Sequence, residues 1–367
     1  MPETGKLHLR IIWDGTTVQD VEVKSSRPKA YRLLQGRLAD DAVKMAPLLY
    51  SVCGKAQHAA ALAAVSAAQN IDWPQNDALE RSVICEAMQE HLWRLLLDWP
   101  ILLGTPPAQQ QFIRWHSTLN EIATGRSDAE NLLFDLCHIL LGMENEEWQE
   151  IDSYAKLRAW MNTGQGWLTQ VLAAIDLKES KLDFIGQNEV CGLMPTWTPT
   201  ELLGMFGSHL EPEFAALPLY DGKPMETGSL AQNQQTPLMR DILHNRPTRL
   251  LARVVARLVE LLDGAVALAS KNMSGSVQAI PASEAAGLSV ARTARGILLH
   301  YVSIEKAQVA NYLTVAPTEW NFHPKGALLS GLAGLKESDA GRLMETVKYF
   351  VLSLDPCVEY EIELNHA

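Results

Sequence analysis

An alanine-rich stretch, GKAQHAAALAAVSAA at residues 54–68, restricts most strongly how this chain can fold. Alanine is the residue most compatible with an α-helix, and its small side chain lets a helix approach its neighbours closely. We therefore expect one long helix over residues 39–68, whose second half packs tightly against other parts of the chain.

Helical periodicity continues through most of the remaining chain. Residues 248–269 give the clearest amphipathic pattern. The acidic stretch at residues 143–150 indicates a solvated turn or a helix end. Residues 176–235 are rich in Pro and Gly, so we expect short helices and some mobility there. Further helices are predicted at residues 77–99 (ended by Pro100), 107–124, 127–142, 153–175 and 338–353.

Strand patterns occur at two places. Residues 7–13 and 16–23 flank Asp14-Gly15, which favours a hairpin because both turn positions need positive φ angles. Residues 286–304 and 306–316 are typical of two further strands around a turn.

The predicted fold class is mainly α with small β additions (α+β), in one domain. The turn between the strands predicted at residues 286–304 and 306–316 is expected near Glu305-Lys306. The predicted parts are an N-terminal β-hairpin at 1–26, a helical body at 36–270, a small β element at 286–316, and a C-terminal helix with a cysteine-bearing tail at 338–367.

Charge and cysteine content exclude several classes of protein. The 367 residues carry a formal net charge of −12, which argues against nucleic-acid binding because that needs a basic face. The five cysteines are widely spread without a CxxC pair, so we expect reduced thiols in the cytoplasm rather than disulfides. We see no signal peptide, and charged residues such as Arg253 and Arg257 interrupt the most apolar stretch, residues 250–268, so no membrane span is expected.

Common catalytic signatures are missing from the sequence. It contains no GxSxG, HExxH, Walker A or GxGxxG motif, and its ten histidines form no zinc-like cluster. Cys85 and Cys137 lie on predicted helices, where core packing is the favoured interpretation.

Three separated stretches together resemble the large subunit of nickel–iron hydrogenases. They are GRLADDAVKMAPLLYSVCGKAQHAAALAA at residues 36–64, ARGILLH with NYLTVAPTEWN at residues 294–300 and 311–321, and SLDPCVEY at residues 353–360. Each stretch is weak alone, but their order and separations match. The resemblance covers nearly the whole chain and implies a large-subunit-like helical bundle.

In that family, two CxxC motifs supply four thiolates that hold nickel and bridge to an iron carrying carbon monoxide and cyanide. Both motifs are halved here. The ungapped match places Tyr50 on the first thiol and Cys53 on the second, whereas an alternative alignment makes Ala56 the lost thiol. At the other end, Cys357 matches the first thiol and Tyr360 replaces the second. The resemblance implies Cys53 and Cys357 as the metal ligands.

The pocket around the diatomic ligands resembles the family more closely. Arg295 matches the arginine beside these ligands, Thr318 the hydroxyl that hydrogen-bonds a cyanide, and Asp355 the aspartate beside the metal. A guanidinium and a hydroxyl suit cyanide nitrogens as acceptors. Gln57 falls where the family has a histidine, and Thr4 where it has a proton-relaying glutamate. These matches imply three cofactor-binding residues and no catalytic residue.

Taken singly, the same residues have ordinary explanations. Cys53 suits a small buried hydrophobe, Arg295 a structural ion pair, and Thr318 a turn next to a proline. The joint match of all the motifs favours the metal-binding interpretation.

The departures are similar to those of the HupK/HoxV-type hydrogenase expression and formation proteins, which resemble the large subunit but act as scaffolds. The resemblance implies transient binding of an Fe(CN)2(CO) unit without nickel. General iron-cofactor maturation machinery would supply the unit, and the apo large subunit of a nickel–iron hydrogenase would receive it with help from a HypC-type small chaperone. An alternative is a metal-free interaction protein with a vestigial pocket. A working hydrogenase is disfavoured because two thiolates are missing.

Overall fold

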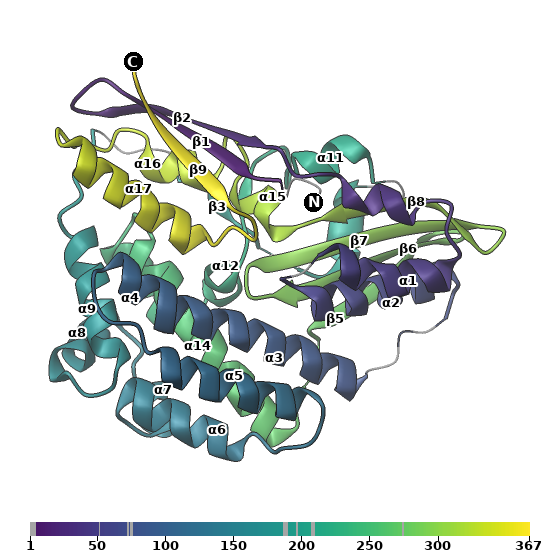
Figure 1. Cartoon of the computed structure of the whole chain (residues 1–367), viewed down its shortest axis with the longest axis horizontal. Helices are drawn as coiled ribbons and strands as arrows, with labels where there is room; N and C mark the ends of the chain where they lie inside the picture. Colours follow the sequence, from purple (N-terminus) through teal and green to yellow (C-terminus); the bar gives the residue numbers. More distant parts are fainter. Residues whose placement is uncertain are drawn as a thin grey trace.

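The computed structural model describes residues 5–50, 52–71, 73, 76–185, 190–195, 197–206, 210–273 and 275–367. Within these residues the chain forms a helical body, a three-stranded sheet, a four-stranded sheet and a pair of short strands (Figure 1). The predicted mainly helical α+β class is confirmed.

A long amphipathic helix, α14 (Leu250–Ser270), lies at the centre of the helical body and confirms the pattern at residues 248–269. Its apolar face is fully buried under the surrounding helices. The helical body also contains α3 (Asp77–Trp93), α4 (Trp99–Leu102), α5 (Gln109–Ala123), α6 (Glu130–Asp135), α7 (Asn145–Gln149), α8 (Tyr154–Thr163), α9 (Leu168–Glu179) and α13 (Pro237–Asn245).

Three helix boundaries differ from the predictions. Pro100 does not end its helix: a π-helical turn (Arg94–Asp98) leads into α4, whose first turn accepts a proline because no backbone N–H donor is required there. Residues 153–175 are split into α8 and α9, since Gly164 takes a left-handed conformation with φ at +68° and ends α8. The acidic stretch at residues 143–150 contains α7, which begins with a capping box.

The predicted long helix at residues 39–68 is wrong in one respect, because it consists of two helices, α1 (Ala39–Leu49) and α2 (Gly54–Ala68). α1 ends shortly after Pro47, which cannot donate the backbone hydrogen bond that a helix interior needs. The break leaves Cys53 outside both helices, at the N-terminal end of α2.

The alanine-rich helix α2 packs on an antiparallel sheet of order β5-β6-β7-β8. The packing is as close as the alanines predict: a Cβ atom on Gly287 would lie 2.1 Å from the carbonyl oxygen of Ala64. Ser289 also donates a hydrogen bond of 2.7 Å to the carbonyl of Ala60. The strands are β5 (Val277–Ser283), β6 (Ala286–Thr293), β7 (Gly296–Glu305) and β8 (Gln308–Val315).

The prediction of a single strand at residues 286–304 is wrong, because the chain turns back between β6 and β7. Gly296 makes this turn with φ at +127°, and a Cβ atom there would lie 2.5 Å from the Thr227 side chain. Only glycine fits such a position. The turn near Glu305-Lys306 is confirmed between β7 and β8, whereas β5 was not predicted.

The two ends of the chain meet in a three-stranded sheet of order β2-β1-β9. The predicted hairpin is confirmed as β1 (Leu7–Trp13) and β2 (Val18–Ser25), but of its turn dipeptide only Gly15 has a positive φ, at +95°. The expected C-terminal tail is instead a strand, β9 (Tyr360–His366), which runs parallel to β1 (Figure 1). The helices α16 (Ala327–Leu332) and α17 (Ala340–Leu354) share a core with this sheet, and α17 confirms the helix predicted at 338–353.

The irregular region at residues 176–235 contains short elements, as predicted. Residues 186–189, 196 and 207–209 lie outside the described residues, and the expected mobility of this region stays a prediction. The elements are β3 (Gly192–Leu193), α10 (Pro199–Phe206), α11 (Pro212–Ala216), β4 (Met225–Glu226) and α12 (Ser229–Asn233).

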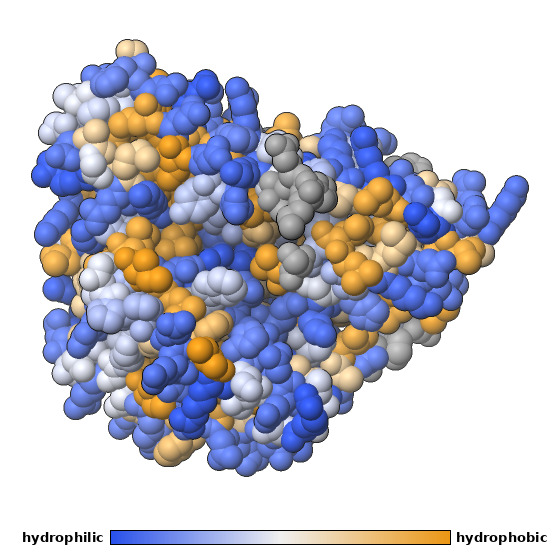
Figure 2. Space-filling model, in the orientation of Figure 1, coloured by the Kyte–Doolittle hydropathy of each residue, from blue (hydrophilic) through white to orange (hydrophobic). Residues whose placement is uncertain are grey.

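The surface on the face of Figure 2 is mostly polar, with apolar side chains gathered in separate patches over the helical body and the sheets. Among the described residues, no helix combines the length and the apolar character needed to cross a lipid bilayer.

Candidate functional site

Cys53 lies in the break between α1 and α2, where the helix packing fixes its backbone. Gln57, one helical turn later, places its Nε2 3.5 Å from the Cys53 sulfur. The carboxylate of Glu86 on α3 accepts the N–H groups of Lys55 and Ala56 at 2.8 and 2.9 Å. The first turn of α2 is therefore anchored to the helical body, and the thiol is positioned with it.

The orientation of Gln57 is set by a buried chain of hydrogen bonds. His300 Nε2 lies 2.8 Å from Gln57 Oε1, and His300 Nδ1 lies 2.7 Å from the Tyr312 hydroxyl. Complete burial lowers the pKa of His300 to about 3, so the ring is neutral and donates from one nitrogen. The amide oxygen of Gln57 thus accepts from His300, and its NH2 group faces Cys53.

Cys357 lies between α17 and β9, where the chain crosses from the helical body to the three-stranded sheet. Thr318, in the short helix α15 (Pro317–Asn321), donates its hydroxyl to the Cys357 sulfur at 3.0 Å and accepts the Cys357 N–H at 3.4 Å. The Thr318 side chain is buried, whereas Cys357 is half-buried. Thr318, which the resemblance implies as the hydrogen-bond donor to a cyanide, thus contacts the Cys357 thiol directly, and its role toward a cyanide stays a prediction.

The two cysteines share one electrostatic environment although they lie near opposite ends of the sequence. Burial, with a smaller contribution from the neighbouring Cys357, raises the pKa of Cys53 to about 12. Such an influence acts over short distances inside a protein. The fold thus brings the two predicted ligands within electrostatic reach of each other, and Cys53 keeps its proton at neutral pH.

Asp355, two residues before Cys357, is the buried centre of an arginine cluster. It caps α17 in a left-handed conformation with φ at +55° and is 1% exposed. Its carboxylate accepts from Arg94 at 2.7 Å and Arg257 at 2.9 Å, and lies 3.3 Å from Arg295 Nε. Burial alone would raise the pKa of Asp355, but the three guanidinium groups hold it well below its usual range.

Arg295 projects from the tight turn between β6 and β7. Its Nη2 donates to Glu90 on α3 at 2.7 Å, and its backbone carbonyl accepts from Asn321 at 3.1 Å. Within the described residues, its Nε has no hydrogen-bond partner despite the closeness of Asp355. Burial works to lower the pKa of Arg295, but Asp355, Glu90 and Cys357 raise it overall. Arg295 therefore lies beside Asp355 and within electrostatic reach of both Cys53 and Cys357.

Four charged residues of this cluster were missed from the sequence: Arg94, Asp98, Arg257 and Glu90. Arg257 had a usable signal, since it interrupts the apolar face of the helix predicted at residues 248–269. Arg94 also pairs with Asp98, one helical turn away. The cluster then contains three guanidinium groups and three carboxylates, so its formal charges balance without an added ligand.

The residues at the positions of the lost thiols are both aromatic. Burial raises the pKa of Tyr50 to about 12. Tyr360 begins β9. Burial raises its pKa, although the nearby Arg94 acts to lower it. Neither phenol is an easily ionised metal ligand in this setting. Thr4, matched to the proton-relaying glutamate, lies outside the described residues.

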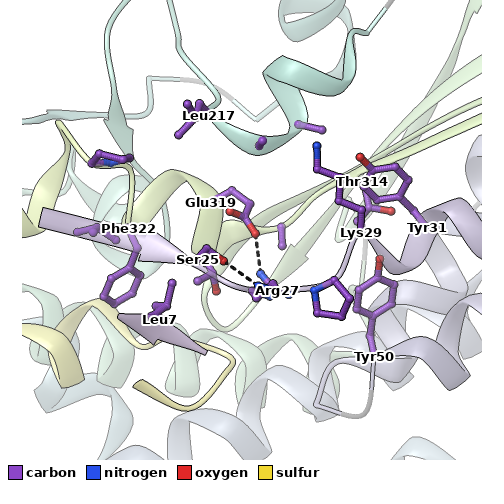
Figure 3. A pocket seen from close by; sticks show the side chains of 17 residues that line it. Leu7, Ser25, Arg27, Lys29, Tyr31, Tyr50, Leu217, Thr314, Glu319 and Phe322 are labelled. Atoms are coloured by element: carbon purple, nitrogen blue, oxygen red, sulfur yellow. Dashed lines mark hydrogen bonds and ion pairs between the residues drawn. The ribbon is translucent and has the colours of Figure 1, made fainter. Parts of the chain in front are cut away.

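A cavity of about 250 Å³ adjoins this site (Figure 3). Tyr50 and Thr318 contribute to its wall, together with Arg27, Lys29, Tyr31 and Glu319. In the described part of the chain, no three or more His, Cys, Asp or Glu side chains form a group that could hold a metal ion. The arrangement instead offers two sulfurs, a hydroxyl, an amide and a guanidinium.

The chain is similar to hydrogenases and to hydrogenase expression/formation proteins. Residues 236–360 match the nickel-dependent hydrogenase family. The chain is 28% identical to the hydrogenase expression/formation protein HoxV of Cupriavidus necator, over 93% of this chain and 92% of that protein. It is also 28% identical to HupK of Azotobacter vinelandii, over 99% of both chains.

The fold matches that of solved hydrogenases. The Ni-Fe-Se hydrogenase of D. vulgaris Hildenborough aligns with a TM-score of 0.60 and 17% identity, over 95% of both chains. The chain thus has a hydrogenase large-subunit-like fold, and its resemblance to the HupK/HoxV-type expression and formation proteins is confirmed over nearly its full length.

Proposed function

From this resemblance to hydrogenase expression and formation proteins, we propose that the chain is a non-catalytic scaffold in nickel–iron hydrogenase maturation. It holds an Fe(CN)2(CO) unit on Cys53 and Cys357 and passes it to the apo large subunit. The observation that supports this most is the contact of Thr318 with the Cys357 sulfur, in the same environment as Cys53 and Arg295. This is a two-thiol version of the four-thiolate site that the family resemblance implies.

The chemistry of loading suits these groups. Two thiols each lose a proton to solvent, two Fe–S bonds form, and the bonds from iron to its donor break, so no electron is transferred. Fe(II) with two cyanides, one carbon monoxide and two thiolates carries a formal charge of −2. Soft thiolates are suitable ligands, and Arg295 and Thr318 supply the donors that cyanide nitrogens accept.

The high pKa of Cys53 gives a reason for transient holding. A thiol whose pKa is about 12 binds iron only by giving up a tightly held proton, so the proton competes with the metal. A receiving site with four thiolates holds the unit more strongly. We therefore expect the scaffold to load from the general iron-cofactor maturation machinery, aided by a HypC-type chaperone, and to unload into the apo large subunit.

Infrared spectroscopy tests this function. The chain is co-expressed with its maturation partners and purified without oxygen, and metal-bound carbonyl and cyanide bands are expected. The bands are expected to disappear in Cys53→Ala and in Cys357→Ala, whereas Cys85→Ala, a buried thiol of the helical core, serves as the matched control. Missing bands in the unmodified protein, or bands unchanged in both site variants, would contradict the proposal.

One observation favours a second function, that of a metal-free interaction protein of the maturation complex. The charges of the arginine cluster are already balanced by its own carboxylates. If the pocket serves only to stabilise the fold, binding to a HypC-type chaperone or a large subunit will survive replacement of both Cys53 and Cys357. Pull-down of the double variant separates the two functions when it is combined with the infrared measurement.

A further inference from the structure

The cavity beside the thiol site has an arginine in its wall that the family resemblance did not indicate. Arg27 follows β2, and a Cβ atom on Gly5 would lie 2.3 Å from the Arg27 Cα, so the N-terminal segment packs directly against it. Figure 3 shows the Arg27 side chain between Ser25 and Tyr50, with Glu319 directed toward it. The fold therefore holds this guanidinium at the cavity.

Arg27 is linked to both halves of the thiol site. Its Nη1 lies 2.9 Å from Glu319, which directly follows Thr318, the residue that contacts the Cys357 sulfur. Burial works to lower the pKa of Arg27, but its neighbours Cys357 and Glu319 raise it overall, and Cys53 also contributes. Arg27 thus feels the charge of both cysteines from the cavity side.

The pairing of Arg27 differs from that of the buried arginines. Among the described residues, Glu319 is the one carboxylate within ion-pair distance of its guanidinium, and both side chains keep some exposure, 14% and 20%. Arg295, by contrast, has two carboxylate partners and is 5% exposed. The Arg27 pair can therefore open toward the cavity without leaving a fully buried charge.

We propose that Arg27 is a second recognition residue for the anionic iron unit, exchanging its ion pair with Glu319 for contact with the cargo that enters through the cavity. This inference rests on the proposed scaffold function. Loading turns two neutral thiols into a complex of charge −2, whereas the charge of Arg295 is already balanced by Glu90 and Asp355. Arg27 is placed to supply a positive charge from the open side, while Glu319 competes with the cargo for it.

Two substitutions that remove the same ion pair from opposite sides test this inference. In protein loaded by co-expression, decay of the carbonyl infrared band during anaerobic incubation gives the rate of cargo loss. Arg27→Gln is expected to lose cargo about tenfold faster than the unmodified protein, in line with removal of one hydrogen bond to a charged group. Glu319→Gln is expected to lose it no faster, because it frees Arg27, and Arg27→Lys is expected to retain cargo longer than Arg27→Gln.

A purely structural ion pair predicts a different pattern, since both substitutions then weaken the fold alike. Faster cargo loss in Glu319→Gln, or equal loss in Arg27→Gln and the unmodified protein, would overturn the role of Arg27 and leave the scaffold function standing. Unfolding midpoints of the variants show whether any has lost its fold. Absence of the bands from the unmodified protein would overturn both proposals.

Discussion

An arginine lies on each side of the thiol pair, but the two arginines differ in their ion-pair partners and in their exposure to solvent. On the closed side, Arg295 is held by Glu90 and by Asp355, whose side chain is inaccessible to solvent. On the open side, Arg27 pairs with Glu319 at the wall of a cavity of about 250 Å³. The difference suggests that one arginine belongs to the fold and the other to the exchange of cargo.

On the closed side, we expect the largest loss of unfolding free energy from a substitution at Asp355. Asp355→Asn leaves three guanidinium groups around a neutral amide, and removing one partner of a buried ionic cluster costs about 3–5 kcal/mol of unfolding free energy. Asparagine tolerates the left-handed backbone at this position, so the effect reports on charge. Denaturant unfolding measures it.

The control for this change is Asp339→Asn, at the exposed N-cap of α17. Asparagine caps a helix as well as aspartate does, so stability is expected to stay unchanged. A loss below about 1 kcal/mol in Asp355→Asn would show that the closed side is not held by its ionic cluster.

A direct contrast of the two arginines sharpens the comparison. Arg295→Gln removes a charged hydrogen bond to Glu90 in a buried setting, and we expect a loss of about 2–3 kcal/mol. Arg27→Gln is expected to cost about 1 kcal/mol, because water in the cavity can take the place of the lost partner. Equal losses in the two variants, measured by the same denaturant unfolding, would remove the distinction between the closed and open sides.

Acid provides the mildest test of the closed side. The folded-state pKa of Asp355 lies below its unfolded value near 3.8, so its stabilising effect is present above about pH 4 and is lost as the pH falls further. The stability gap between the unmodified protein and Asp355→Asn is therefore expected to be full at pH 6 and smaller at pH 3. A gap that stays constant over this range would mean that Asp355 is not ionised in the folded protein.

Elements with local signals were predictable from the sequence. The Asp14-Gly15 hairpin and α14 need only a turn dipeptide and an apolar period, and both are present. The break before Cys53 was missed because the apolar and alanine-rich pattern predicts one continuous helix over residues 39–68. In the structure, Pro47 and tertiary packing end the first helix. Strand β9 was missed because its partner β1 lies at the other end of the chain.

The site residues also fall into two groups, those found from sequence motifs and those that were missed. Cys53, Cys357 and Thr318 were found through motifs, and the structure makes them neighbours. Their role as ligand and cargo contacts stays a prediction. Arg94, Arg257 and Arg27 were missed because each comes from a different element and acquires its partner only in the folded chain.

The most direct test of the scaffold is the number of sulfur atoms bound to its iron. X-ray absorption at the iron edge, on protein purified anaerobically with its maturation partners, is expected to show two sulfur ligands at about 2.3 Å, the usual length of a metal–thiolate bond. Metal analysis of the same sample is expected to show no nickel. An iron centre without sulfur ligands, or one with the same sulfur ligands after both Cys53 and Cys357 are replaced by alanine, would contradict the account.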